Sequence, residues 1–99
     1  MGALPKEVIK KVITRAKAQV RYCYEKELAQ QPDLQGKLTV KFVITATGSV
    51  AKAQIQDSTL NDKAVQDCVS RVIKRLRFPS PSGGGIVVVN YPFVFKAAN

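Results

Sequence analysis

The sequence contains no histidine, only two cysteines and only seven acidic residues. Without histidine there can be no His-based catalytic triad and no His metal ligand, and two cysteines outside a CxxC spacing cannot build a zinc site alone. The few carboxylates show no paired spacing across a cleft, and no nucleophile stands beside a base. We therefore expect a protein that is not an enzyme, with no catalytic residues, no metal and no cofactor.

Long apolar runs are also missing. No stretch reaches the roughly 18 apolar residues that a membrane helix needs, and no signal peptide opens the chain. A chain of 99 residues has room for one core, so we expect a single domain over residues 1–99. Met1-Gly2 directly before a helix-like stretch indicates a domain excised from a larger protein.

Positive charge is abundant, with 16 Lys and Arg residues and a net charge of +9. Such a balance attracts an anionic partner, either an acidic protein, lipid phosphates or nucleic acid, although basic helix faces are often only solvated surface. We expect no nucleic acid, because most aromatic residues fall on predicted core positions and no RNA-binding motif is present. The candidate anionic contacts are Lys10, Lys17, Arg21, Arg71, Lys74 and Arg75.

The spacing of apolar residues predicts the order helix, strand, strand, helix, strand. A first helix follows Pro5 and ends before QQPDLQG, and a second, capped by Asn61, carries an apolar stripe from Val65 to Leu76. Alternating residues indicate strands at 38–45, 50–57 and 86–95. We expect an α+β domain with a three-stranded antiparallel sheet in the order 2-1-3 and both helices packed on one face.

Pro92 interrupts the last strand and supports an edge position for it. Proline has no N–H to donate, so it belongs on the unpaired side of an edge strand, and even-numbered residues then direct their backbone groups outward. Residues 86–95 carry no charge that would protect this edge. An exposed edge can also bind nothing, or pair with a second copy in a homodimer. The candidate partner-binding residues are Ile86, Val87, Val88, Val89, Asn90 and Tyr91.

Two segments of the chain resemble a known family. KFVITATGSVAKAQIQDSTLNDKAVQDCVSRVIKRLRFPSPSGGGIVVVNYPFVF resembles the C-terminal domain of TonB-family energy transducers, and LPKEVIKKVITRAKAQVRYCYEKELAQQPDLQGK is similar to the AgmX/PglI-type branch found in gliding-motility proteins. The resemblance implies a periplasmic domain of an inner-membrane-anchored protein. It also implies that the last strand takes up an extended segment of an outer-membrane or periplasmic partner and transmits force from an inner-membrane motor complex.

The two cysteines lie on the apolar faces of the two predicted helices. In the oxidising periplasm that the resemblance implies, Cys23 and Cys68 would form a disulfide that restricts the unfolded chain by roughly 4 kcal/mol. The alternative is two buried free thiols that pack as small apolar side chains.

Overall fold

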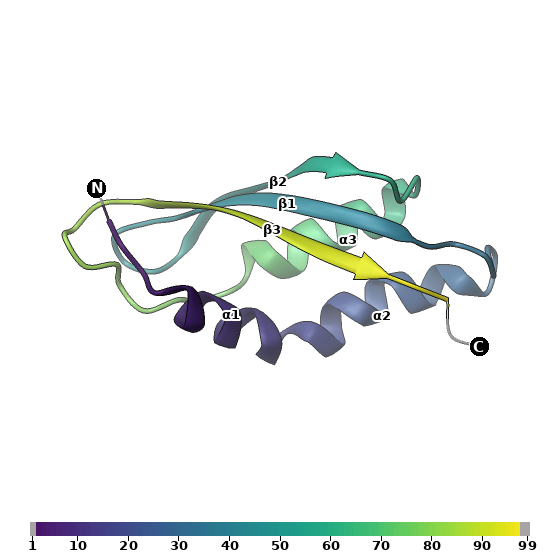
Figure 1. Cartoon of the computed structure of the whole chain (residues 1–99), viewed down its shortest axis with the longest axis horizontal. Helices are drawn as coiled ribbons and strands as arrows, with labels where there is room; N and C mark the ends of the chain where they lie inside the picture. Colours follow the sequence, from purple (N-terminus) through teal and green to yellow (C-terminus); the bar gives the residue numbers. More distant parts are fainter. Residues whose placement is uncertain (1, 98–99) are drawn as a thin grey trace.

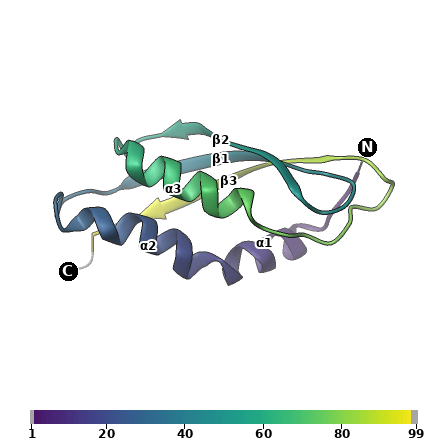
Figure 2. The ribbon, with the colours of Figure 1, turned by 180° about the vertical axis from the view of Figure 1, so that it is seen from behind.

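The computed structural model describes residues 2–97, which form one sheet with helices on one of its faces (Figures 1 and 2). The sheet is antiparallel and three-stranded, in the order β2-β1-β3. The predicted fold class and strand order are therefore confirmed. The elements are α1 (Lys6–Arg15), α2 (Lys17–Leu28), β1 (Gly36–Ile44), β2 (Val50–Ser58), α3 (Lys63–Lys74) and β3 (Val87–Phe95).

The segment predicted as one long helix is divided in two at Ala16. This residue leaves helical geometry, with φ −94° and ψ 2°, and its N–H is bonded to the Ile13 carbonyl at 3.0 Å. Ile13, Ala16 and Val20 are all buried, so the break keeps both apolar stripes against the sheet. Figure 1 shows α1 and α2 following one another along the sheet with a change of direction, which suits the twist of its strands.

The core lies between the helices and the inner face of the sheet. Along β1, Leu38, Val40, Phe42 and Ile44 are fully buried and alternate with half-exposed residues, as period-two patterning predicts. β1 and β2 are joined by a turn in which Gly48 has a φ of +90°, and an added Cβ there would come within 1.9 Å of the Phe78 carbonyl oxygen. Glycine is required at this turn because both its conformation and its surroundings exclude a side chain.

The N-terminal cap of α3 differs from the prediction. Asp62, not Asn61, is the capping residue, and its carboxylate accepts a hydrogen bond from the Val65 N–H at 3.0 Å. The other carboxylate oxygen of Asp62 accepts from the Gln31 side chain at 2.7 Å. A carboxylate suits this position because it satisfies a free N–H and the positive end of the helix dipole together.

Cys23 of α2 and Cys68 of α3 form a disulfide, with their Cα atoms 5.6 Å apart. The bridge links α2, which lies beside the C-terminal half of β3, to α3, which packs on β2. Of the two states left open by the sequence, the structure has the disulfide.

Candidate functional site

β3 pairs with β1 without interruption. The register runs from Gly36 opposite Phe95 to Ile44 opposite Val87, nine consecutive pairs with no bulge. Hydrogen bonds at both ends of β1 give the direction of its backbone groups: the Lys37 carbonyl accepts from the Thr59 N–H, and the Thr45 N–H is bonded to the Ser49 carbonyl. Odd-numbered residues of β1 therefore point their backbone groups toward β2, and even-numbered ones point toward β3.

The same alternation divides β3 into an inward and an outward set. Its odd-numbered residues lie opposite the even-numbered residues of β1 and bond to them. Its even-numbered residues, Val88, Asn90, Pro92 and Val94, direct their backbone groups away from the sheet. Pro92 lies opposite Thr39, where its missing N–H costs the sheet no hydrogen bond.

The predicted binding residues divide between these two sets. Val88 and Asn90 are outward and exposed, with Val88 at 51% exposure. Val87, Val89 and Tyr91 bond to β1 and turn their half-buried side chains toward the helices.

Ile86 precedes β3, and its carbonyl already accepts a hydrogen bond from the Gly2 N–H at 3.2 Å. The free rim therefore begins at Val88. It extends further than predicted, to Val94, which is 64% exposed and has the same even parity that selects Val88 and Asn90. The rule that even-numbered residues face outward, if continued past Pro92, would have predicted from the sequence that Val94 belongs to the rim.

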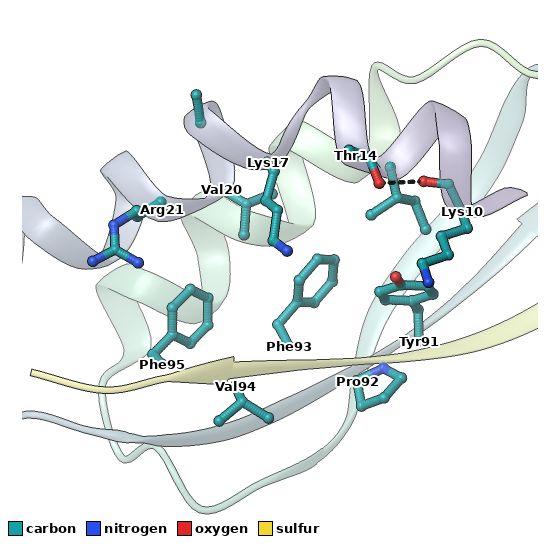
Figure 3. A pocket seen from close by; sticks show the side chains of 12 residues that line it. Lys10, Thr14, Lys17, Val20, Arg21, Tyr91, Pro92, Phe93, Val94 and Phe95 are labelled. Carbon is teal, nitrogen blue, oxygen red and sulfur yellow. Dashed lines mark hydrogen bonds between the residues drawn. The ribbon is translucent and has the colours of Figure 1, made fainter.

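A groove follows β3 on the helix side of the sheet, and we call it the β3 groove. It consists of two adjoining hollows of about 440 and 420 Å³, which share Lys10 and Tyr91. The larger lies between α1, α2 and the C-terminal half of β3, and the smaller between α1 and residues 87–91. Figure 3 shows Lys10, Lys17 and Arg21 on the helix side of this space, facing Tyr91, Phe93 and Phe95.

Aromatic rings line the β3 side of the groove. The centroids of Tyr91 and Phe93 are 5.1 Å apart, those of Phe93 and Phe95 are 6.4 Å apart, and Tyr24 of α2 stacks on Phe95 at 5.0 Å. The Tyr24 hydroxyl donates to the Leu34 carbonyl. Burial raises the pKa of the Tyr24 phenol above its ordinary value, and the positive charge of Arg21 opposes this shift. The row of rings anchors the C-terminal half of β3 to the core while its other edge stays free.

The structure separates the six candidate anionic contacts into two groups. Lys10, Lys17 and Arg21 line the β3 groove. Arg71, Lys74 and Arg75 belong to α3 or its C-terminal cap, and α3 packs on β2 and β1 (Figure 2). The Lys74 ammonium donates to the Ala51 carbonyl of β2 at 2.9 Å, so this cation covers the opposite edge of the sheet.

Within residues 2–97, no group of three or more metal-ligating side chains comes together. None of the described helices is long and apolar enough to cross a bilayer.

The comparisons with known proteins place the chain in a family. A family model described as "Gram-negative bacterial TonB protein C-terminal" matches residues 26–97. The chain therefore belongs to the TonB C-terminal domain family, as its sequence predicted. Domains of this family are non-enzymatic, interact with partner proteins and are periplasmic in Gram-negative bacteria.

Solved structures of TonB C-terminal domains share the fold, among them the following two. The C-terminal domain of Helicobacter pylori TonB matches with a TM-score of 0.69 and 23% identity, over 98% of this chain and 87% of that one. The C-terminal domain of Pseudomonas aeruginosa TonB matches with a TM-score of 0.54 and 25% identity, over 71% of this chain and 73% of that one.

One relative that matches the chain is named as a kinase and not as a TonB protein. The chain is 30% identical over 88 residues to a protein from Myxococcus xanthus (strain DK1622) named tyrosine-protein kinase MasK. The match covers 89% of this chain and 13% of that protein, so the chain spans a small part of its relative's length. The assignment to the AgmX/PglI-type branch depends on residues 4–37, most of which precede the matched range of the family model, and it stays a prediction.

Proposed function

We propose that the domain captures an extended segment of an outer-membrane or periplasmic protein as a fourth strand along the outer edge of β3. The domain would belong to a longer protein that is anchored in the inner membrane and contacts an ion-driven motor complex. Force from the motor would then pass through the domain to the captured segment. Gliding motility is the process that the AgmX/PglI resemblance favours.

One observation carries this proposal: within residues 2–97 no strand pairs with the outer edge of β3, which is uncharged and without a bulge from Val88 to Val94 and lacks only the N–H of Pro92. Sheets usually protect an edge of this length with charges, bulges or a covering segment, because free backbone groups recruit other strands. In strand addition, main-chain hydrogen bonds supply the affinity and side-chain contacts supply the selectivity. The rim offers these bonds at each outward group except the missing N–H of Pro92, and the β3 groove beside it offers the side-chain contacts.

An amide-shift titration tests strand capture directly. The ¹⁵N-labelled domain is titrated with synthetic peptides that cover extended periplasmic segments of envelope proteins from the same organism. Capture predicts the largest shifts at Val88, Asn90 and Val94, together with slower amide exchange at these three residues. Shifts confined to α3 and β2 for every peptide that binds would contradict the proposal.

A homodimer is the second candidate, because the same uninterrupted edge could pair with its copy. Sedimentation over a range of protein concentrations distinguishes the two. A stable dimer in which the Val88 and Asn90 amides are already protected would replace peptide capture as the function of this edge.

Nucleic-acid binding is a further alternative for so basic a domain, although the sequence already argued against it. The arrangement of the aromatic residues argues against it, because Tyr22 is the one strongly exposed aromatic residue among residues 2–97 and the other rings are partly or fully buried. Single-stranded nucleic acids are typically bound on several exposed rings in a row.

A further inference from the structure

We infer that the segment captured by β3 carries acidic side chains at alternating positions, on the side of the strand that faces α1 and α2. This inference rests on the proposed strand capture and specifies the chemistry of the partner. Its basis is the composition of the β3 groove, which among residues 2–97 is lined by cations, aromatic rings and aliphatic side chains and by no carboxylate.

The two faces of an added strand would meet different surroundings. Neighbouring strands are separated by roughly 4.8 Å, so side chains on the helix-facing side would continue the row of Tyr91, Phe93 and Phe95 one strand further out. These helix-facing side chains of the added strand would lie at the mouth of the β3 groove, beside the cations of α1 and α2. Side chains on the other face would lie beside Val88, Asn90, Pro92 and Val94, none of which is charged.

The groove cations are available to a partner. Within residues 2–97, Lys10 and Lys17 take part in no ion pair. Arg21 pairs with Glu25 at 3.0 Å, but both side chains are about half exposed, and such a pair contributes little and is readily exchanged. Lys6 adds a further positive charge at the N-terminal end of the groove.

The two groove lysines lie beside different rings of β3. Figure 3 shows Lys10 beside Tyr91 and Lys17 beside Phe93, and these two aromatic residues are two positions apart on β3. Side chains on one face of a strand are likewise two positions apart, about 6.6 to 6.8 Å. Two acidic residues separated by one residue would therefore each meet a cation, whereas two adjacent acidic residues would point to opposite faces.

Three octapeptides of alternating composition test the charge requirement. They are Glu-Thr, Gln-Thr and Lys-Thr repeats, capped at both ends, and their binding is followed by fluorescence anisotropy and amide shifts. We expect the Glu-Thr peptide to bind most tightly, the Gln-Thr peptide about five- to tenfold more weakly and the Lys-Thr peptide more weakly still. A fourth peptide with the same glutamates and threonines, but with glutamates in adjacent pairs, should lose part of this advantage.

Two pairs of substitutions separate a local contact from the general attraction of a basic protein. Lys10→Gln with Lys17→Gln removes two groove cations, and Lys11→Gln with Arg15→Gln removes two exposed cations of α1 that do not line the groove. Both variants lower the net charge equally. We expect the first to weaken Glu-Thr binding about five- to tenfold and the second less than twofold.

The outcomes are distinct. Equal affinities for the Glu-Thr and Gln-Thr peptides, or equal losses in the two variants, would overturn the charge inference and leave strand capture standing if Val88 and Asn90 still shift. Glu-Thr binding that shifts only helix residues would contradict strand capture itself. If no peptide binds, while phosphatidylglycerol vesicles bind in a manner that depends on Lys10 and Lys17, these cations serve a membrane surface and the inference is wrong.

Discussion

The sheet has two edges, and they are built in opposite ways. β2 has two register shifts against β1, which leave Ala51 and Gln56 without a partner, and it carries charges at Lys52 and Asp57. Lys74 reaches from α3 to the Ala51 carbonyl. β3 has the same length, no register shift and no charge.

This difference shows that the fold can protect an edge and does so on one side only. Bulges twist a strand away from a flat partner, and charges oppose the approach of another chain. β2 has both devices, whereas β3 has neither over Val88 to Val94 and carries Pro92 as its one protecting residue. Such an edge is a liability for aggregation unless it is used, so the contrast between the edges supports a binding role more strongly than the exposure of β3 alone.

The largest expected effect concerns the disulfide, which links the helices behind the two edges. Reduction should lower the free energy of unfolding by about 4 kcal/mol, because it frees a loop with a sequence separation of 45 residues in the unfolded chain. The measurement is denaturant unfolding with and without reductant. The Cys23→Ala, Cys68→Ala variant is the control, since reductant should leave its stability unchanged.

The contrast between the edges should survive this loss. In the reduced protein under native conditions, the outward amides of Val88 and Asn90 should still exchange faster than the inward amides of Val87 and Val89. A change of less than about 1 kcal/mol on reduction would mean that the linked helices are already held by packing alone.

A matched pair of prolines compares the edges directly. Val88→Pro removes an outward N–H from β3, and Ala53→Pro does the same on β2, because Ala53 lies opposite Phe42, whose backbone groups face β3. We expect Val88→Pro to weaken peptide binding at least about 100-fold, because Pro92 already lacks an N–H and a second proline would leave only Asn90 and Val94 as outward donors of the rim. Ala53→Pro should leave binding unchanged.

Thermal unfolding of both proline variants provides the control for folding, since neither substitution removes a bond within the sheet. Val89→Pro, in contrast, removes a bond to β1 and should destabilise the domain itself. Equal losses of binding in Val88→Pro and Ala53→Pro would show that the two edges are equivalent and that β3 has no special role in binding.

The edge of β3 was predictable from sequence because one residue type has a strict rule. Pro92 cannot donate a hydrogen bond, and this fixed both the edge position and the parity of the outward groups. The two bulges of β2 were not predictable, because Ala51 and Gln56 differ from their neighbours in no local preference and the register depends on packing against α3. The division at Ala16 was hidden for a similar reason, since alanine is an excellent helix former and nothing in the local sequence marks a break there.

The candidate site was predictable only in part. The free rim followed from parity, but the hydrogen bond between Gly2 and Ile86 joins segments distant in sequence. The division of the six basic residues into a groove group and an α3 group could not be predicted either, because it depends on tertiary structure. Lys10 and Lys74 lie on helices of similar composition, and only packing places one beside β3 and the other against β2.

A smaller effect concerns Tyr24, which holds the C-terminal end of β3 through its stack on Phe95. Tyr24→Phe keeps the stack and removes the hydrogen bond to the Leu34 carbonyl, so we expect a loss of about 1 kcal/mol in stability near pH 7. Burial raises the pKa of this phenol, so the folded state holds its proton to higher pH than the unfolded state. The stability that the protonated Tyr24 phenol contributes is fully present below a pH of about 10. It is lost as the pH rises through the folded-state pKa.

Denaturant unfolding of both proteins from pH 7 to pH 11 measures this difference. The advantage of the wild type over Tyr24→Phe should shrink above a pH of about 10, because only the wild type must keep a buried phenol neutral. An advantage that stays constant to pH 11 would contradict the raised pKa. Peptide binding near pH 7 should be the same in both proteins, since Tyr24 does not form the rim.

The smallest effect distinguishes the two devices that protect β2. Lys74→Met keeps most of the side-chain stem and removes the ammonium that donates to the Ala51 carbonyl, which should cost at most about 0.5 kcal/mol because the contact is exposed. If the bulges at Ala51 and Gln56 are the stronger protection, the variant should still bind one peptide, at β3 only. The stoichiometry from calorimetry and the amide shifts of β2 report this. A second site on β2 would instead show that one lysine kept that edge closed, and that the two edges differ by charge more than by shape.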